Sequence, residues 1–313
     1  MYKDLVVSVV VPAYNEESLI GETLGSIPGY IDHVFVVDDG SGDGTWEIIL
    51  ECQGKDPRIV SLQHEKNRGV GAAIITGYRK ALEDGVDVAV VMAGDNQMDP
   101  GHIPDLLDPI VEGRAVYSKG NRLMSEEYRR GMSRWRTLGN MMLTFLTKLA
   151  SGYWQIMDPQ NGFTAISRRA LEALDLDRVY AYYGYCNDLL VKLNVYGFKV
   201  LDVQIPARYG NERSKIRYAS YIVRVSWMLL RNFFWRLKMK YVILSFNPVV
   251  FFYLAGLMIT PVSIVFGVYS LHYYFVQGGP LFIRAALSLL LFIVGMQFLF
   301  FAMLFDMQND RNA

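Results

Sequence analysis

The sequence has few cysteines and no net charge. Only two of its 313 residues are cysteine, Cys52 and Cys186, which excludes a disulfide framework and a cysteine-based zinc site. Its 31 lysines and arginines are balanced by 31 aspartates and glutamates, so the bulk charge gives no basis for nucleic-acid binding. We therefore expect both cysteines to be reduced packing residues and no nucleic acid among the partners.

Charge is also missing from two long stretches near the C-terminus. No Asp, Glu, Lys or Arg occurs between Lys240 and Arg284, and the run Ala285–Phe305 is again uncharged. A helix needs about 20 apolar residues to cross a bilayer core, so each stretch is long enough. The pattern predicts two transmembrane helices joined by the turn Gln277–Pro280. A buried hairpin of a soluble protein is the alternative, but helices of this length then normally carry a polar stripe.

The basic residues beside these stretches predict the orientation of the chain. Cations precede the first span, whereas the turn is uncharged, which by the positive-inside rule places the N-terminal domain and the short tail in the cytoplasm. These cations are Arg231, Arg236, Lys238 and Lys240. We expect an integral membrane protein at the cell membrane, or at the endoplasmic reticulum membrane in a eukaryote. The expected segments are a cytoplasmic domain at 1–208, interfacial helices at 209–245, two spans at 246–306 and a tail at 307–313.

Short β-branched runs alternate with helical patterns over the first two hundred residues. The predicted strands are 5–11, 33–37, 58–63, 86–92 and 115–118, and the predicted helices are 16–26, 44–52, 69–83 and 103–112. This alternation predicts an α/β fold, with a mostly parallel sheet and helices on both faces. Ligands of such sheets bind beyond the carboxyl ends of the strands, and the polar motifs of this sequence fall there.

A further helix is predicted between this domain and the first span. Its cations recur at every seventh position, close to two helical turns, and so form one stripe: Arg217, Arg224, Arg231 and Lys238. An apolar stripe lies elsewhere on the same helix: Ile222, Val225, Leu229 and Phe233. The pattern suits an amphipathic helix in the membrane interface. A solvated helix packed on the first domain is the alternative.

Acidic and aromatic residues follow the first two predicted strands. The first strand leads into Pro12, Tyr14 and Glu16, and the second leads into Asp38 and Asp39. Carboxylates at neighbouring strand ends can accept hydrogen bonds from ribose hydroxyls and a base imide, and Tyr14 could support the base plane. The alternative is a plain turn, because Asp and Gly are common turn formers.

The segments after the third and fourth strands could hold a diphosphate. Asn67–Ala73 opens a helix with small residues, and a helix N-terminus favours anions; tight helix packing is the alternative. After the fourth strand, Asp95 and Gln97 can present oxygen atoms to a hard divalent cation that would bridge two phosphates. Asp99, before Pro100, is expected to cap a helix start instead.

Four of these motifs, in this order and spacing, resemble glycosyltransferase family 2: P-A-Y-N-E, V-V-D-D-G-S, N-R-G-V-G-A-A and G-D-N-Q-M-D-P. The resemblance implies the GT-A fold, a nucleotide-binding α/β sheet. Three later motifs, together with two C-terminal spans, resemble the branch of the family that acts on polyprenyl phosphates: Lys119–Arg122, Asp158–Phe163 and Ser214-Lys215. The likeness by motif covers residues 5–217.

The resemblance implies roles for particular residues. A UDP- or GDP-linked sugar donor would be held by strand ends and the glycine-rich segment: Pro12, Tyr14, Glu16, Asp38, Asp39, Arg68, Gly69, Gly94 and Asp95. Asp95 and Gln97 would hold Mg²⁺ or Mn²⁺. The acceptor phosphate would contact cations: Arg122, Arg136 (or Arg134), Arg208 and Lys215. Relatives often have Asp-x-Asp where this chain has Ala93-Gly94-Asp95. The missing first carboxylate would lower the metal affinity, or a water would take its position.

The implied reaction is transfer of a hexose to the phosphate of a polyprenyl or dolichyl phosphate, with inversion at the anomeric carbon. A lipid phosphate is already anionic near neutral pH, so it needs no protein base, and cations can position it. Asp95, Arg122 and Asp188 are the predicted catalytic residues. Asp188 lies in the region where relatives that act on hydroxyl acceptors keep a base. Asp158 is expected to order the acceptor loop or to contact the donor.

Two alternative functions stay open. The first is a family 2 transferase that acts on a sugar hydroxyl, for which Asp188 would be indispensable. The second is a donor-binding scaffold without catalysis, suggested by Ala93. It is disfavoured by the joint retention of four site residues: Asp95, Gln97, Arg122 and Lys215. The sequence names neither the sugar nor the nucleotide, and it leaves the oligomeric state undetermined.

Overall fold

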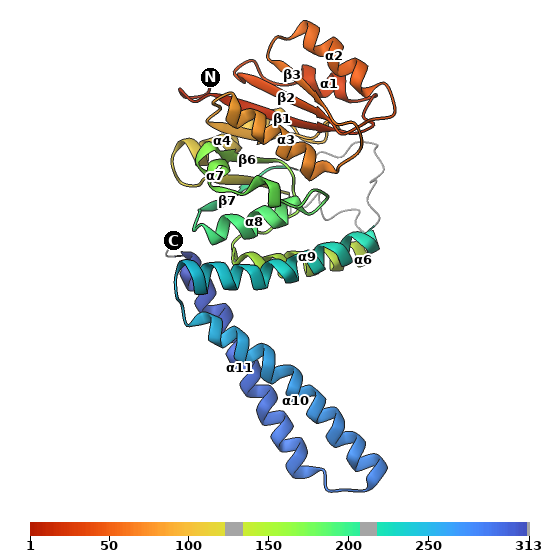
Figure 1. Cartoon of the computed structure of the whole chain (residues 1–313), viewed down its shortest axis with the longest axis vertical. Coiled ribbons are helices and arrows are strands. Elements are labelled where there is room, and N and C mark those ends of the chain that lie inside the picture. Colours follow the sequence, from red (N-terminus) through yellow and green to blue (C-terminus); the bar gives the residue numbers. More distant parts are fainter. Residues whose placement is uncertain (123–133, 207–217, 312–313) are drawn as a thin grey trace. The chain divides into compact units, whose positions relative to one another are not determined.

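The computed structural model describes residues 1–122, 134–206 and 218–311. The chain divides into two compact units, Met1–Phe233 and Phe234–Ala313. The first contains a β-sheet with its helices, and the second contains two long apolar helices (Figure 1). The boundaries expected from the sequence at residues 208 and 245 stay predictions.

A seven-stranded sheet in the order β3-β2-β1-β4-β6-β5-β7 forms the centre of the first unit. The strands are β1 (Val7–Ala13), β2 (His33–Asp38), β3 (Ile59–Gln63), β4 (Val88–Val91), β5 (Tyr117–Asn121), β6 (Thr164–Ser167) and β7 (Val200–Gln204). β6 runs antiparallel to both of its neighbours, β4 and β5, while the other pairs are parallel. The strands β1, β2, β4 and β5 therefore all end at the same edge of the sheet.

Helices cover both faces of this sheet. Val10 of β1 packs into a core with α3, α7 and α8, whereas Val9 and Val11 pack into a second core with α1, α2 and α4. A strand buried on both faces has a nearly continuous apolar sequence, and β1 fits this pattern with Ser8 as its one polar residue. The helices are α1 (Ile20–Gly25), α2 (Thr45–Lys55), α3 (Val70–Glu83), α4 (Ile103–Val111), α6 (Arg134–Ser151), α7 (Arg168–Ala173) and α8 (Tyr185–Val195), with short 3₁₀ turns at η1 (Pro100–His102) and η2 (Leu176–Arg178).

The predicted α/β sheet with flanking helices is confirmed, but two strands and three helices were not predicted: β6, β7, α6, α7 and α8. β6 has only four residues, too few for a period-two pattern to stand out. The predicted strand at 115–118 is also displaced, because the ladder with β7 extends from Tyr117 to Asn121.

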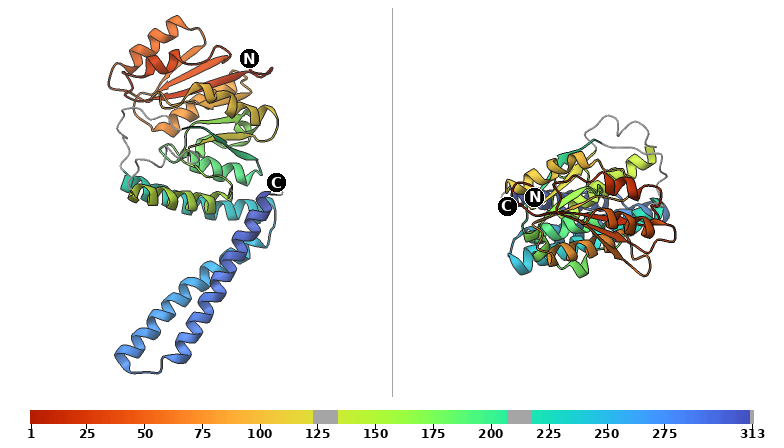
Figure 2. Two further views of the ribbon diagram at one scale, coloured as in Figure 1. Left: turned by 180° about the vertical axis from the view of Figure 1, so that it is seen from behind. Right: turned by 90° about the horizontal axis from the view of Figure 1, so that it is seen from above.

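The predicted amphipathic helix is α9 (Tyr218–Lys238), which is followed by a π-helical segment, η3 (Met239–Leu244). It lies beside α6, where Gly139 faces the side chain of Ile222 (Figures 1 and 2). The other members of the predicted apolar stripe are buried: Val225, Leu229 and Phe233. Other large apolar side chains of the two helices are exposed: Met141, Met142 and Phe145 of α6, and Val223, Trp227 and Leu230 of α9.

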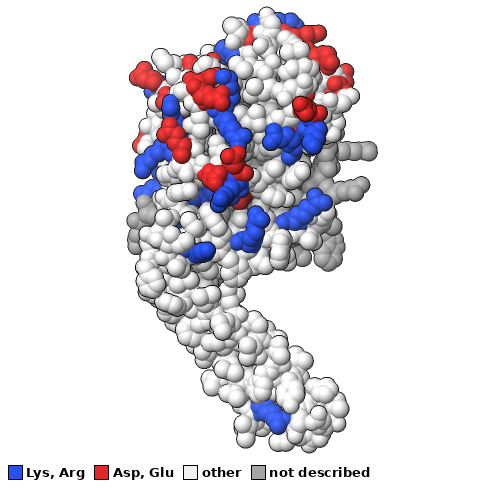
Figure 3. All heavy atoms as spheres, viewed as in Figure 1, with Lys and Arg blue, Asp and Glu red and all other residues white. Residues whose placement is uncertain are grey.

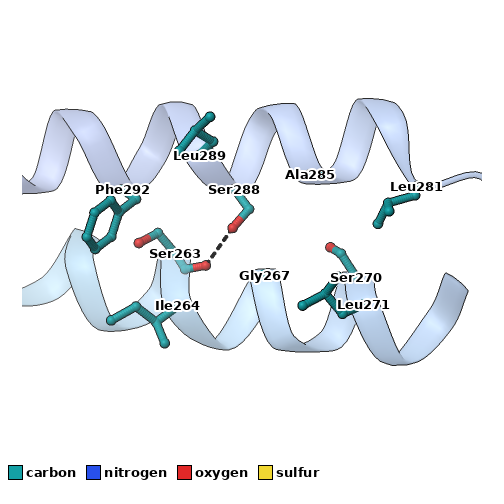
Figure 4. Close-up of a pocket in the computed structure, with 10 residues that line it drawn as sticks. All are labelled: Ser263, Ile264, Gly267, Ser270, Leu271, Leu281, Ala285, Ser288, Leu289 and Phe292. Atoms are coloured by element: carbon teal, nitrogen blue, oxygen red, sulfur yellow. Dashed lines mark hydrogen bonds between the residues drawn. The ribbon is translucent and has the colours of Figure 1, made fainter. Parts of the chain in front are cut away.

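The second unit is a hairpin of α10 (Val249–Gln277) and α11 (Phe282–Arg311). Both helices are long and apolar enough to cross a membrane. A Cβ on Gly256 would lie 2.6 Å from Leu299, so the small residue lets the helices approach closely. Nearer the turn, the hydroxyl of Ser288 donates a 2.8 Å hydrogen bond to the carbonyl of Ser263, beside a groove of about 260 Å³ (Figure 4).

Charge is nearly absent from the hairpin surface (Figure 3), and Arg284 is the only charged residue between Lys240 and Asp306. Within this unit Arg236 and Asp306 form a buried ion pair, with 2.7 Å between Nη2 and Oδ2. The hydroxyls of Tyr241 and Tyr253 donate to the same carboxylate. The buried charges are thus paired and hydrogen-bonded, which offsets the cost of removing them from water.

Candidate active site

Three sequence motifs meet at the carboxyl edge of the sheet. β1 lies between β2 and β4, and its last residue, Ala13, is in register with Asp38. The amide of Asp39 donates to the carbonyl of Ala13 at 2.8 Å, and the amide of Gly94 donates to the carbonyl of Pro12 at 3.2 Å. The sheet therefore brings together the predicted donor-binding residues of β1, β2 and β4.

The loops after β1 and β2 are held together by side-chain hydrogen bonds. The amide of Asn15 donates to Ser41 Oγ, and Asn15 Oδ1 accepts from the amide of Gly42, both at 2.9 Å. The amide of Glu16 donates to Thr45 Oγ1 at 2.8 Å. These bonds fix the backbone that follows Tyr14, whose side chain is 40% exposed and accessible to a ligand.

The carboxylate of Asp38 is fully buried and shapes the turn after β2. Its Oδ1 accepts from the amide of Ser41 at 3.2 Å and from the Ser41 hydroxyl, and its Oδ2 accepts from Gln63 Nε2 at 3.1 Å. Its oxygens thus bond to the protein itself. A direct contact with a donor nucleoside stays a prediction for this residue.

The carboxylate of Asp39 holds the segment that precedes α3. Its Oδ1 lies 2.7 Å from His64 Nδ1 and accepts from the amide of Arg68 at 2.9 Å, while Oδ2 accepts from the amide of Gly69 at 2.8 Å. Asp39 is 2% exposed, so it forms a buried link between the end of β2 and the start of α3. The donor-binding roles of Asp39, Arg68 and Gly69 stay predictions.

The glycines of this segment are closely packed against residues that precede α8. A Cβ on Gly69 would lie 2.5 Å from the carbonyl oxygen of Ala181, and one on Gly71 would lie 2.3 Å from that of Tyr180. The amide of Ala72 donates to the carbonyl of Ala181 at 3.0 Å. No local sequence pattern predicts this contact. The close approach agrees with the tight-packing alternative for these glycines.

Substitution of Gly71 by Ala is expected to destabilise the protein by about 1–3 kcal/mol, because the new methyl group would overlap a backbone carbonyl that cannot rotate away. Gly54 in α2 has no atom within 4 Å of its Cβ position and provides the matched control. Gly54→Ala should be neutral or slightly stabilising, since Ala favours helix. Thermal unfolding of both variants checks this, and equal melting temperatures would contradict it.

The loop after β4 presents Asp95 and Gln97. The amide of Gln97 donates to Asp95 Oδ1 at 3.1 Å, and Asn96 between them has a left-handed φ of 56°. Gly94, which precedes Asp95, is held by α1, because Thr23 Oγ1 donates to the carbonyl of Gly94 at 3.1 Å. Asp95 is half-buried and Gln97 is exposed.

Arg122, at the end of β5, forms an ion pair with Asp158. Nε of Arg122 donates to Oδ2 at 2.8 Å, and Nη2 donates to Oδ1 at 3.2 Å. Beneath this pair the fully buried Lys119 donates from Nζ to the carbonyls of Asp158 and Asn161. Two cations therefore hold the loop before β6 in place, a long-range arrangement that sequence reasoning missed for Lys119 and Asn161.

The ionisation of Asp158 follows from these contacts. Burial alone would raise the pKa of this carboxyl, but the charge and hydrogen bonds of Arg122 outweigh burial, with help from Lys119. The pKa of Asp158 therefore lies below its ordinary value, and the side chain is an anion at neutral pH. Arg122 retains partial exposure, with 32% of its side chain accessible.

The Asp95 loop and the Asp158 loop border each other. The Sδ atom of Met98 lies 3.3 Å from the amide of Ala93, and its Cε approaches to 3.5 Å of the position that a Cβ on Gly162 would take. The segment with the predicted metal ligands thus adjoins the segment that holds Arg122. The loop with Asp95 and the loop that holds Arg122 are therefore neighbours at this edge of the sheet.

Asp188, the candidate base, is buried in α8 with 1% exposure. Its Oδ2 accepts from the amide of Tyr180 at 2.8 Å and from Lys192 Nζ, and its Oδ1 accepts from Asn232 Nδ2 at 2.5 Å. Both carboxylate oxygens thus bond to other protein groups. Its catalytic role stays a prediction.

Comparison with known protein families matches the chain to "Glycosyl transferase family 2" over residues 8–175, more than half of its length. The chain belongs to this family. The match spans all four motifs at the strand ends and the Arg122–Asp158 pair, so the resemblance expected from the sequence is confirmed.

Three relatives with named activities are similar over just under two thirds of this chain. A UDP-N-acetylglucosamine–dolichyl-phosphate N-acetylglucosaminyltransferase of Methanococcus voltae is 32% identical over 210 residues, which cover 61% of this chain and 83% of the relative. A polyprenol monophosphomannose synthase of Mycolicibacterium smegmatis is 32% identical over 210 residues, covering 63% and 75%. A dolichol-phosphate mannosyltransferase of Pyrococcus furiosus is 29% identical over 214 residues, covering 65% and 56%.

Solved structures support the GT-A fold. Glucosyl-3-phosphoglycerate synthase from Mycobacterium tuberculosis superposes with a TM-score of 0.53 at 22% identity, covering 74% of this chain and 80% of that protein. A second mycobacterial protein gives a TM-score of 0.58 at 22% identity, covering 73% and 75%. The expected fold, a GT-A-like sheet followed by two long apolar helices, is thereby confirmed.

Family 2 enzymes with this fold commonly use a divalent cation. The described residues contain no group of three His, Cys, Asp or Glu side chains that could enclose a metal by themselves. Asp95 and Gln97 nevertheless offer hard oxygen ligands on one exposed loop, which fits a cation that takes its remaining ligands from phosphates and water. Ala93 supplies no such oxygen from its side chain, so Asp95 is the one carboxylate of the segment Ala93-Gly94-Asp95.

Three of the predicted acceptor-phosphate residues cannot be placed in this family 2 site. Arg208 and Lys215 lie outside the described residues, and so does the side chain of Arg136. Their roles stay predictions, and Arg122 is the predicted acceptor cation whose side chain the structure describes.

Proposed function

We propose that this family 2 transferase moves a hexosyl group from a UDP- or GDP-linked sugar to the phosphate of a polyprenyl or dolichyl phosphate, with inversion at the anomeric carbon. N-acetylglucosamine joins the candidate sugars because the Methanococcus voltae relative carries it in its name. The main support is the adjacency of the Asp95 loop to the loop that holds Arg122, in a chain with two apolar helices.

The acceptor phosphate needs a cation rather than a base. Near neutral pH it is already an anion, so its oxygen can attack the anomeric carbon directly once repulsion from the donor diphosphate is moderated. Arg122 is suited to this task, because Asp158 fixes its guanidinium while part of the side chain stays exposed. A single in-line attack of this kind inverts the anomeric carbon.

Asp95 and Gln97 would hold Mg²⁺ or Mn²⁺ beside the donor diphosphate. When bound, the cation would neutralise negative charge on the departing nucleoside diphosphate. Tyr14, Asp38 and Asp39 would form the nucleoside side of the site: Tyr14 by contact with the base, and the two buried carboxylates by fixing the surrounding turns.

The membrane is the expected location of this reaction. The exposed apolar side chains of α6 and α9 are accompanied by cations of α9. Arg224 and Arg231 are exposed, and Trp227 between them is 70% exposed. Such a surface suits the interface of a bilayer with anionic lipids. The cations before α10 and the uncharged turn favour an integral membrane protein with the catalytic domain on the cytoplasmic face.

A donor panel tests the proposal. The purified full-length protein in lipid vesicles is incubated with UDP- and GDP-linked sugars, Mg²⁺ or Mn²⁺ and a polyprenyl phosphate, and the lipid product is analysed by mass spectrometry. We expect one nucleotide sugar to give a polyprenyl-phosphate sugar, and polyprenol without its phosphate to give none. Transfer to a hydroxyl acceptor, or no transfer to prenyl phosphate from any donor, would refute the proposal.

A further inference from the structure

The Asp188 carboxylate joins three segments of the first unit. It lies on α8, it accepts from the backbone amide of Tyr180 in the segment before α8, and it accepts from Asn232 on α9. Lys192, one helical turn further along α8, completes the cluster as an ion-pair partner. Asp188, Lys192 and Asn232 are 1%, 9% and 6% exposed, so the cluster is closed to solvent.

From Tyr180 the contacts continue to the donor side of the site. The carbonyl of Ala181 accepts from the amide of Ala72, and the carbonyl of Tyr180 lies against Gly71. Gly69 directly precedes α3, and its amide donates to the carboxylate of Asp39. An unbroken series of backbone and carboxylate contacts thus runs from Asn232 on α9 to the end of β2.

The opposite face of α9 is the one exposed to the surroundings. Trp227 and Leu230 are 70% and 48% exposed, whereas Asn232 points into the protein. The proposed function places α9 in the membrane interface. A displacement of α9 would then be transmitted to Asp188 through the hydrogen bond from Asn232. The inference therefore rests on the proposed function for its biological meaning, while the contacts are independent of it.

We propose that Asp188 is a positioning residue rather than a base: it links the interfacial helix α9 to the turn at 69–72 and thereby sets the affinity for the nucleotide sugar. The carboxylate is well suited to such a link because it accepts three hydrogen bonds from three different segments. A base must instead reach the acceptor, and a side chain 1% exposed with both oxygens engaged does not.

An exchange of the two side chains distinguishes these roles. In Asp188→Asn the remaining carbonyl oxygen can serve Tyr180 and Lys192, and the new amide can donate to a carboxylate at position 232. Asn232→Asp alone places two carboxylates face to face. The double variant Asp188→Asn/Asn232→Asp again pairs one donor with one acceptor. It therefore restores the hydrogen bond between α8 and α9, but it does not restore a base at position 188.

Steady-state kinetics of these variants in vesicles is the first measurement. Asn232→Asp should raise the KM for the nucleotide sugar about tenfold with kcat within about threefold of wild type. The double variant should return the KM to within about threefold of wild type. A kcat that collapses equally in Asp188→Asn and in the double variant would overturn the proposal in favour of a base, and so would an unchanged KM in Asn232→Asp.

Amide hydrogen exchange is the second measurement, and it needs no turnover. Peptides that contain Ala72 and Tyr180 should exchange their amide hydrogens faster in Asn232→Asp than in wild type. If Asn232→Asp does not fold, the milder Asn232→Ala should show the same increase. The double variant should exchange as slowly as wild type. Unchanged protection in both single variants would refute the link. If wild type transfers no sugar but exchange behaves as described, the proposed function fails while the link stands.

Discussion

Substitution of Asp95 by Asn is expected to reduce sugar transfer about 100-fold at a fixed Mg²⁺ concentration, equivalent to about 3 kcal/mol of transition-state stabilisation. Asp95 is the one carboxylate of the segment Ala93-Gly94-Asp95 that follows β4. If this carboxylate is the only protein carboxylate that binds the metal, no other can compensate for its loss. The loss should appear in kcat and in the metal concentration needed for half-maximal rate.

Asp99 is the matched control for this variant. It lies four residues further along the same loop, and its Oδ1 accepts from the amide of Gly101 at 2.8 Å, as a cap of η1. Asn can cap equally well, so Asp99→Asn should transfer sugar at close to the wild-type rate. Comparable losses in both variants would mean that the loop, rather than the Asp95 carboxylate, matters. A rate for Asp95→Asn within about threefold of wild type would exclude the metal role.

The part of the site that lies at the ends of β1, β2 and β4 could be predicted from the sequence. Each motif directly follows a run of buried β-branched residues, and parallel neighbours end at a common edge. Local pattern is sufficient in such a case. Asp39 illustrates the limit of that reasoning, since its position was predicted but its bonds to His64 and to the amides of Arg68 and Gly69 depend on how distant turns fold together.

The rest depends on contacts between residues far apart in the chain. Arg122 and Asp158 are 36 positions apart and meet only because the short strand β6 is inserted antiparallel between β4 and β5. The close approach of Gly71 to Tyr180 likewise has no local signal. Periodicity also cannot tell which of two apolar stripes faces inward, and in α9 the predicted stripe with Val225 is buried while the exposed one includes Trp227.

Arg122→Gln is expected to lower the kcat/KM for the prenyl phosphate about 100-fold and to destabilise the protein by about 3 kcal/mol at neutral pH. The glutamine keeps a polar side chain but removes the charge that would face the acceptor phosphate. It also leaves the Asp158 carboxylate, 4% exposed, without its main counter-charge. The activity loss is measured by lipid-product formation and the stability loss by thermal unfolding.

The pH dependence of this destabilisation separates the ion pair from a packing effect. In wild type the Asp158 pKa is lowered, so the pair contributes stability above the ordinary Asp pKa and loses it as the pH falls through the lowered value. Without the Arg122 charge the Asp158 pKa must rise, so the variant binds a proton at a higher pH than wild type does. The difference in melting temperature between wild type and Arg122→Gln should therefore be largest at neutral pH and decrease on acidification. Arg168→Gln is the control, because it breaks an exposed ion pair with Glu172, and its melting temperature should stay close to that of wild type at every pH. A difference for Arg122→Gln that does not change with pH would mean that lost packing, not lost charge, causes the destabilisation.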